Sequence, residues 1–121
     1  MSELRAPDPR KRCAFCDIVF EQAPATIVRR WGDSVAFVPL NPVTPGHLLV
    51  VPVLHVRDAI EAPEVTGATM RHAAMLAERP CNIITSAGAE ATQTVLHFHV
   101  HIVPRRAGDG LALPWTGQVP S

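Results

Sequence analysis

The chain reads His97-Phe98-His99-Val100-His101-Ile102-Val103-Pro104 at its most informative stretch, where imidazole and apolar side chains alternate. Successive side chains of a β-strand point to opposite faces, so this alternation predicts three histidines on one face and Phe98, Val100 and Ile102 on the other. Aromatic and β-branched residues are typical of a face that packs on a core. Three of the six histidines of the chain lie in this stretch. We therefore expect a reactive face backed by a core face.

Two simpler interpretations compete with this hypothesis. A surface strand with outward histidines would explain one isolated histidine, but it gives no reason for the apolar backing. A histidine-rich metal-storage tract is a compositional run without a strand pattern. Residues two apart on a strand lie about 6.5 Å apart at Cα, so neighbouring rings can share a phosphate-sized ligand or divide between a metal and a substrate.

The composition predicts one domain. With 121 residues, 47% of them hydrophobic and 18% charged, the chain has the size of a single unit with one core. Eleven basic and eleven acidic residues cancel, so net charge gives no indication of binding to a nucleic acid polymer or a membrane surface. Residues 1–12 lack the apolar core of a signal peptide, and three cysteines suit reduced thiols, so we expect a cytoplasmic protein.

Turn residues divide the chain into short elements. Residues 1–12 carry prolines and charges without periodicity, so we expect a flexible lead-in before a domain over residues 13–121. Pro63 suits the first turn of a helix, and Pro80 suits the end of one. The expected helices are residues 17–22 and 63–78, and the expected strands are residues 27–31, 34–38, 47–52, 81–85 and 97–103, with a loop over residues 88–93.

These residues resemble the histidine triad (HIT) family, whose signature is His-x-His-x-His followed by two apolar residues. Residues 97–103 satisfy that signature in full, and the resemblance runs from Cys13 to about Trp115. Residues 41–52 are similar to the segment that leads into a central strand of the family. Gln93-Thr94-Val95 stands where members carry such residues before the triad, and residues 104–109 are similar to the dinucleoside-polyphosphate hydrolases of the family.

The resemblance implies a fold and an assembly. The fold would be α+β, with a five-stranded, mainly antiparallel sheet, one longer helix and a short N-terminal helix. Relatives commonly pair, so a homodimer is expected, with residues 108–121 as an extended tail that reaches toward the partner.

The resemblance also implies a hydrolase or transferase that cleaves at the α-phosphate of a dinucleoside polyphosphate or a nucleoside phosphoramidate. His99 would be the nucleophile and would form a nucleotidyl-histidine intermediate, while His101 would contact and orient the phosphate. An attacking imidazole must be neutral, and an unperturbed pKa of about 6.5 makes the neutral form available in the cytoplasm. The competing functions are a non-catalytic nucleotide-binding module and a zinc-stabilised interaction module.

Several other residues are candidates for substrate binding. Gln93, Thr94 and Ser86 can donate hydrogen bonds to phosphate oxygens, although ordinary loop capping explains Gln93 and Thr94 equally well. Phe37 and Leu40 are candidates for a base pocket or for the core. The chain departs from the family in Ser86-Ala87-Gly88, where Asn-x-Gly is usual, and in Pro39, where relatives carry an acceptor for ribose hydroxyls.

The pair Cys13-x-x-Cys16 predicts a zinc site, because two thiolates at that spacing chelate one ion and two nitrogen ligands would complete a tetrahedron. A redox pair or two buried thiols are the alternatives. By resemblance the remaining ligands are His55 and His97, in a closed structural site, while His47 is a rival that we expect to pack or hydrogen-bond at its strand. His72 is expected to be solvated or capping, and Cys81 to be a small buried residue.

Overall fold

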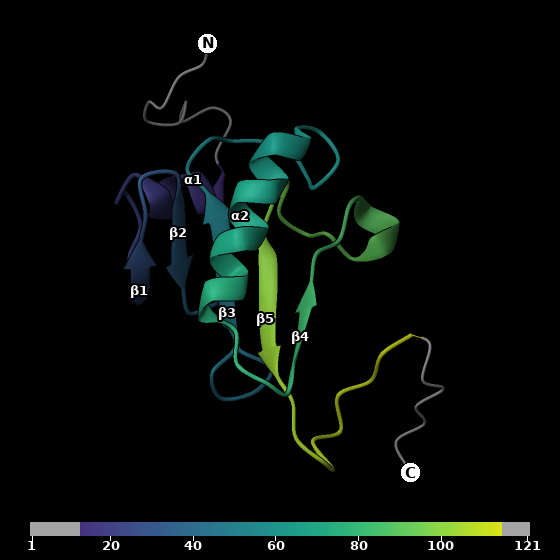
Figure 1. Ribbon diagram of the computed structural model, residues 1–121. Coiled ribbons are helices and arrows are strands. Elements are labelled where there is room, and N and C mark those ends of the chain that lie inside the picture. The colour runs from purple at the N-terminus through teal and green to yellow at the C-terminus, as the bar shows by residue number, and fades with distance from the viewer. Residues whose placement is uncertain (1–12, 115–121) are drawn as a thin grey trace.

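The computed structural model describes residues 13–114, which form a five-stranded antiparallel sheet with one long helix against it (Figure 1). The α+β architecture that the resemblance implied is confirmed. The elements in chain order are α1 (Ala14–Val19), β1 (Ile27–Arg30), β2 (Ser34–Phe37), β3 (Leu48–Pro52), α2 (Pro63–Leu76), β4 (Cys81–Ile84), the 3-10 turn η2 (Ala89–Ala91) and β5 (Val100–Pro104).

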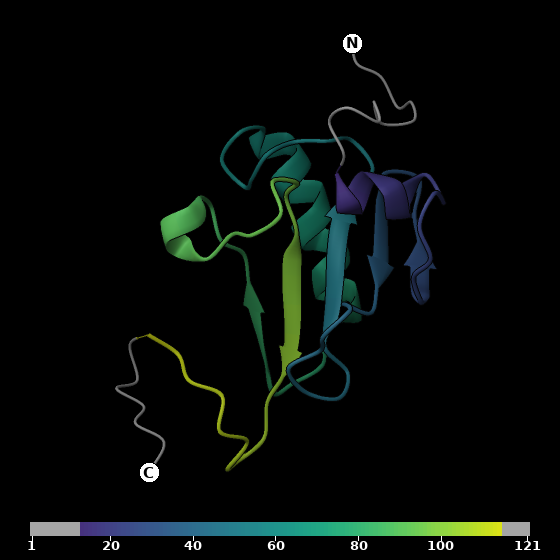
Figure 2. The same cartoon turned by 180° about the vertical axis from the view of Figure 1, so that it is seen from behind.

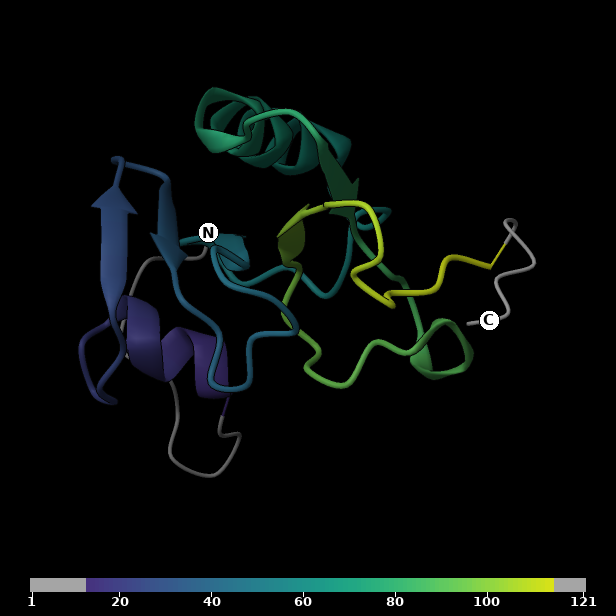
Figure 3. The ribbon, with the colours of Figure 1, turned by 90° about the horizontal axis from the view of Figure 1, so that it is seen from below.

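The sheet has the strand order β1-β2-β3-β5-β4, and every neighbouring pair is antiparallel. Strand β5 therefore lies between β3 and β4, although it comes last in the chain. Helix α2 covers one face of the sheet, and α1 and η2 lie on the other side, as Figures 2 and 3 show. The last strand thus brings the triad residues into the middle of the fold.

Each face of the sheet has its own hydrophobic cluster. The cluster beneath α2 contains Ala36, Val50, Val56, Ala73, Phe98, Val100 and Ile102. The cluster beside α1 contains Phe15, Val19, Val35, Phe37, Leu49 and Val51. Strands β2 and β3 contribute alternate residues to the two clusters, which explains why both are almost continuously apolar. Full burial of each valine, leucine, isoleucine or phenylalanine in these clusters contributes about 1.5–3 kcal/mol.

The triad segment keeps its predicted alternation but not its predicted strand. Phe98, Val100 and Ile102 all lie in the cluster beneath α2. The regular strand begins at Val100, whereas the prediction began at residue 97. The reason is that the first residues of the segment bond outside the sheet ladder: the Phe98 N–H donates to the Val56 carbonyl at 2.7 Å. The triad histidines consequently straddle a strand end.

The N-terminal helix also begins earlier than predicted, at Ala14, and ends at Val19, whereas the expected span was residues 17–22. Cys13 acts as the N-cap, because its sulfur accepts the Cys16 N–H at 3.3 Å. The cysteine pair therefore defines the start of this helix. The loop expected over residues 88–93 contains the short turn η2, and the other strands agree with the prediction to within one residue.

Helix α2 ends at Leu76, two residues before the predicted end, because Ala77 already has an extended backbone ahead of Pro80. The expectation for His72 was wrong. Its side chain is buried and stacks on Trp31, with ring centroids 4.3 Å apart and an interplanar angle of 6°. Its Nδ1 lies 2.9 Å from the Ser34 hydroxyl. Helix α2 is thereby attached to the β1–β2 hairpin.

The two edges of the sheet differ. Strand β1 has a register irregularity between Ile27 and Arg29, and it exposes Arg29 and Arg30. Strand β4 has a regular register with β5 and is only partly covered. Cys81, expected to be buried, is half-buried because it lies on this edge.

The residues after β5 are held by one guanidinium. Arg105 donates to the Asp109 carboxylate at 2.8 Å, to the Asn82 side-chain oxygen at 2.6 Å and to the Leu111 carbonyl at 2.6 Å. The Arg105 hydrogen bonds hold the pKa of Asp109 well below its usual range. The first part of the predicted tail is thus attached to β4, and residues 115–121 lie outside the described residues. Within residues 13–114, no helix is long and apolar enough to cross a membrane.

Truncation of Phe98 tests the core assignment. Phe98 is fully buried, so Phe98→Ala should lower the free energy of unfolding by about 3–5 kcal/mol, through lost burial and the cavity that remains. The measurement is urea denaturation followed by circular dichroism. Val28→Ala is the control, because Val28 is 47% exposed and its truncation should change stability by less than about 0.5 kcal/mol. Equal effects of the two substitutions would contradict the assignment.

Candidate functional site

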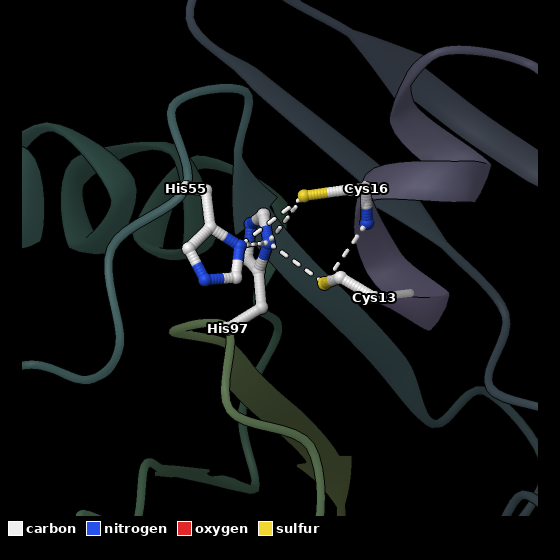
Figure 4. A group of neighbouring side chains, drawn as sticks. All are labelled: Cys13, Cys16, His55 and His97. Atoms are coloured by element: carbon white, nitrogen blue, oxygen red, sulfur yellow. Dashed lines mark hydrogen bonds between the residues drawn. The ribbon is translucent and has the colours of Figure 1, made fainter. Parts of the chain in front are cut away.

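Four metal-ligating side chains from three separate segments meet beside α1 (Figure 4). Cys13 and Cys16 come from the start of α1, His55 comes from the loop after β3, and His97 comes from the segment before β5. Their ligand atoms all lie within 4.8 Å of one another. The structure therefore brings together the full set of residues that the sequence and the resemblance predicted for a metal site.

The distances within this cluster match one tetrahedral ion. The Cys16 sulfur lies 3.2 Å from His55 Nδ1, and both sulfurs lie 3.5 Å from His97 Nδ1. The two histidine Nδ1 atoms are 3.1 Å apart. Zinc bonds of about 2.3 Å to sulfur and about 2.0 Å to nitrogen place tetrahedral ligand atoms about 3.3–3.8 Å apart. Four of the six distances between ligand atoms are thus close to those around one zinc ion.

The protonation of His97 suits a ligand. Its Nε2 lies 2.9 Å from the Pro52 carbonyl oxygen, which can only accept, so Nε2–H donates and the Nδ1 lone pair faces the cluster. Burial lowers the pKa of His97 to about 4, with smaller contributions from His55 and His99, so the ring is neutral at physiological pH.

To act as a metal ligand, Cys16 must be a charged thiolate, whereas His97 must be neutral. Burial, followed by the hydrogen bond and the charge of Cys13, raises the pKa of Cys16 to about 12. A cation in the cluster is what would favour the thiolate. Both observations agree with a site whose charge is completed by a divalent metal.

The second triad histidine has its tautomer fixed by the first. His99 Nδ1 lies 2.8 Å from the His97 carbonyl oxygen, so Nδ1–H donates and the lone pair is left on Nε2. The ring packs edge-on against Phe15, with centroids 4.9 Å apart. Burial lowers the pKa of His99, which favours the neutral ring. The geometry therefore supplies an unprotonated imidazole nitrogen.

The third triad histidine has its tautomer fixed from another direction. The Val43 N–H donates to His47 Nδ1 at 3.1 Å, so the hydrogen of His47 is on Nε2. That Nε2–H donates to His101 Nδ1 at 2.9 Å. Neutral His101 consequently carries its hydrogen on Nε2. Burial, with smaller contributions from His99 and His47, lowers the pKa of His101 to about 4.

The two rings form an adjacent and complementary pair. The centroids of His99 and His101 are 5.1 Å apart in an edge-to-face arrangement. One ring presents a lone pair at Nε2, and its neighbour presents an N–H at the same position. His47, a rival metal ligand in the sequence, instead hydrogen-bonds at the start of its strand as we expected. Its role in orienting His101 was not predicted, because it depends on the Val43 N–H and on the β3–β5 register.

The residues proposed for substrate binding occupy different environments. The Gln93 amide nitrogen donates to the carbonyls of Arg57 and Val95, and its oxygen accepts the Gly88 N–H. Gln93 therefore caps the loop that precedes the triad, which is one of the two roles its sequence position allowed. Thr94 is exposed and Ser86 is partly exposed.

The two candidates for a base pocket also differ in solvent exposure. Phe37 is 2% exposed and packs edge-on against Phe15 in the cluster beside α1, so its position is that of a core residue. Leu40 is 93% exposed, so the core alternative for Leu40 was wrong. A leucine of this exposure in the turn before β3 is free to meet a ligand. Pro39 offers no side-chain acceptor beside it.

Comparison with known proteins gives a consistent result. A sequence profile described as the HIT domain matches residues 21–108. The chain is 30% identical over 115 residues to Protein hit of Bacillus subtilis, a match that covers 87% of this chain and 79% of that protein. It is 29% identical over 108 residues to the adenylylsulfatase HINT3 of Arabidopsis thaliana, covering 82% of this chain and 55% of that protein.

A solved structure that contains zinc is also similar to this chain. The zinc-bound histidine triad family protein of Mycobacterium smegmatis matches with a TM-score of 0.73 and 35% identity, covering 83% of this chain and 79% of that chain.

The hydrogen-bond pattern predicts three tautomers that NMR can observe. Long-range ¹H–¹⁵N correlation spectra at about pH 7 should show His99 as the Nδ1–H form, and His47 and His101 as Nε2–H forms. The reason is that each ring has one nitrogen committed to a partner of fixed polarity. His99 in the Nε2–H form would contradict the arrangement, because its hydrogen would then occupy the nitrogen that we describe as free.

Proposed function

Because the chain belongs to the HIT family, we propose that it is a hydrolase or transferase that cleaves nucleotide conjugates at the α-phosphate through a nucleotidyl-histidine intermediate. The observation that carries this proposal is the pair of rings in which His99 Nε2 has no hydrogen and the neighbouring His101 Nε2 has one. The substrates are dinucleoside polyphosphates or nucleoside phosphoramidates. An adenylylsulfatase among the relatives supports chemistry at a nucleotide phosphate.

In the first step, the lone pair of His99 Nε2 forms a bond to the α-phosphorus, and the bond from phosphorus to the leaving group breaks. A polyphosphate leaving group departs as an anion and needs no proton, whereas the nitrogen of a phosphoramidate takes up a proton from solvent and departs as an amine. The positive charge that develops on His99 is stabilised by its Nδ1–H bond to the His97 carbonyl. The Nε2–H of His101 donates to a phosphate oxygen and disperses negative charge in the transition state.

In the second step, water attacks the phosphorus and the phosphorus–nitrogen bond breaks. The electron pair returns to His99 Nε2, the nucleoside monophosphate leaves, and the proton of the water passes to solvent. Both steps require that His99 keeps its orientation while its charge changes. The fixed partner of Nδ1 and the packing of Phe15 support that requirement.

We propose that Thr94 and Ser86 bind the phosphate through their hydroxyls and that Gln93 acts from within the same loop. The amide of Gln93 is committed to three backbone groups, so its contribution is to hold the loop in place. Leu40 would contact the base from its exposed position, and Phe37 would support that contact from the core.

We propose that the metal is zinc and that Cys13, Cys16, His55 and His97 hold it in a structural site. Two thiolates and two neutral imidazoles make a closed, neutral site, and the zinc-bound relative supports the choice of metal. When bound, zinc supplies a link between the start of α1 and the segment that leads into β5. His99 and His101 are not members of the ligand set.

A second candidate function is a nucleotide-binding module without turnover. The observation that favours it is Pro39, which offers no acceptor for the ribose hydroxyls at a position where the resemblance implies one. A third candidate function is a zinc-stabilised interaction module. If the protein shows no turnover, a nucleotide titration distinguishes the two modules, because only the nucleotide-binding module should bind nucleotide to saturation.

We further propose a cytoplasmic homodimer. None of the three cysteines forms a disulfide, which suits a reducing compartment. Strand β4 lies at an edge of the sheet, and Ile83 on it and Met75 on α2 are 38% and 57% exposed. These features favour a second copy at this edge, which sedimentation equilibrium would detect as twice the mass of the chain.

Intact mass spectrometry tests the reaction. The protein is mixed briefly with adenosine phosphoramidate or diadenosine polyphosphate and then quenched without acid. The mass of the wild type should then include an added nucleoside monophosphate. His99→Ala should carry none, because it lacks the nucleophile, and turnover should fall by at least about a thousandfold. Unchanged circular dichroism and retained nucleotide binding would establish that the variant is folded. A wild type that binds nucleotide without mass addition or turnover would favour the binding module instead.

Metal analysis tests the zinc proposal. The wild type prepared without chelator should contain about one equivalent of zinc, and Cys16→Ser should lose most of it because a thiolate ligand is removed. Cys81→Ser is the matched control, since Cys81 lies on β4 outside the cluster and should leave the zinc content unchanged. Equal zinc content in both variants would contradict the assignment of ligands.

A further inference from the structure

A hollow lies on the α2 side of the sheet, away from the pair formed by His99 and His101. It is a pocket of about 420 Å³ between the first half of α2, the turn that joins β1 to β2, and the end of β3. This volume lies within the usual range for small-molecule sites. His99 faces Phe15 of α1 on the other side of the sheet, so the proposed reaction does not use this pocket.

The walls of the pocket are mainly carbon. Val53 and Leu54 line it from the loop after β3, and Val65 and Ala68 line it from α2. Leu54 is 39% exposed, so part of its side chain is available for burial by a ligand. An apolar body of one ring or a branched chain would remove this surface from water.

Two charged side chains line the pocket, and both are acidic. Asp33 stands in the β1–β2 turn, and Glu64 stands in the first turn of α2. The Asp33 side chain is 59% exposed, and the Val53 N–H donates to the Asp33 carbonyl at 2.9 Å, which attaches the turn to the end of β3. The two carboxylates thus border an apolar space from opposite elements.

The basic side chains around Asp33 lie outside the lining of the pocket. His72 Nδ1 lies 3.6 Å from Asp33 Oδ1, and the same nitrogen lies 2.9 Å from the Ser34 hydroxyl. The Arg29 guanidinium lies over the Trp31 ring, 5.1 Å from its centroid. Neither His72 nor Arg29 is part of the pocket lining, so the charge that a ligand meets in the pocket is negative.

We propose that this pocket binds a small organic cation, that is, an ammonium or amidinium group attached to a compact apolar body. The apolar body would pack between β3 and α2, while the cationic group would remain near the rim beside Asp33 and Glu64. A cation at a rim keeps part of its hydration, so pairing with the carboxylates adds selectivity without a large desolvation cost. An anion of the same shape would be repelled.

Three probes of one shape and different charge test the chemistry. They are 2-phenylethylammonium, 2-phenylethanol and phenylacetate, each titrated into the full chain and followed by the amide chemical shifts of Val53, Val65 and Ala68. The cation should bind at least about fivefold more tightly than the alcohol, and phenylacetate should bind most weakly. Equal affinities, or no shifts up to about 20 mM cation, would overturn the proposal.

Substitutions test the location. Asp33→Asn combined with Glu64→Gln should reduce the affinity for the cation to that of the alcohol, while Glu78→Gln, a change at an exposed residue after α2, should not. Ala68→Phe should fill the pocket and weaken the binding of the cation and of the alcohol at least about tenfold. Gly67→Ala is its control, because a Cβ at the exposed Gly67 meets nothing within 4 Å. Binding that survives Ala68→Phe would place the probe elsewhere and overturn the assignment.

Discussion

The hydrogen bond from His99 Nδ1 to the carbonyl oxygen of His97 is the contact on which the site depends. The same residue, His97, donates from its ring to the Pro52 carbonyl and turns its other nitrogen toward the two cysteines. One residue therefore joins β3, the start of α1 and the imidazole of His99. Because a carbonyl oxygen can only accept, the Pro52 carbonyl leaves a lone pair on His97 Nδ1, and the His97 carbonyl separately leaves a lone pair on His99 Nε2. The proposed metal site and the orientation of the proposed nucleophile therefore depend on the same residue.

The alternation in residues 97–103 was sufficient to predict which side chains enter the core, because the period of two does not depend on hydrogen-bonding partners. It was insufficient to predict where the strand begins, since Phe98 bonds to Val56 and not to a neighbouring strand. The start of α1 was missed for a related reason. Cys13 was considered as a ligand only, although its sulfur is also the N-cap of the helix. His72 was expected to be solvated or capping because its partner Trp31 is distant in the chain and outside the helix.

The ligand cluster was predictable because the Cys-x-x-Cys spacing restricts the chemistry and the resemblance supplied His55 and His97. The tautomers were not predictable, because they depend on contacts that form only in the folded chain, such as the Val43 N–H on His47. The candidates around the triad show the same limit. Sequence position placed Gln93 beside the histidines, but only the structure shows that its whole amide is occupied by backbone groups.

The unequal edges of the sheet have a consequence for how copies of the chain can assemble. At β1 the ladder is interrupted by its register irregularity and flanked by Arg29 and Arg30, features that discourage the addition of another strand. At β4 the register is regular up to the edge. Another copy of the chain can therefore add a strand at β4 but not at β1. A dimer joined through its two β4 strands would have no regular edge left to which a third copy could pair. A sheet with two regular edges would instead permit open-ended fibres.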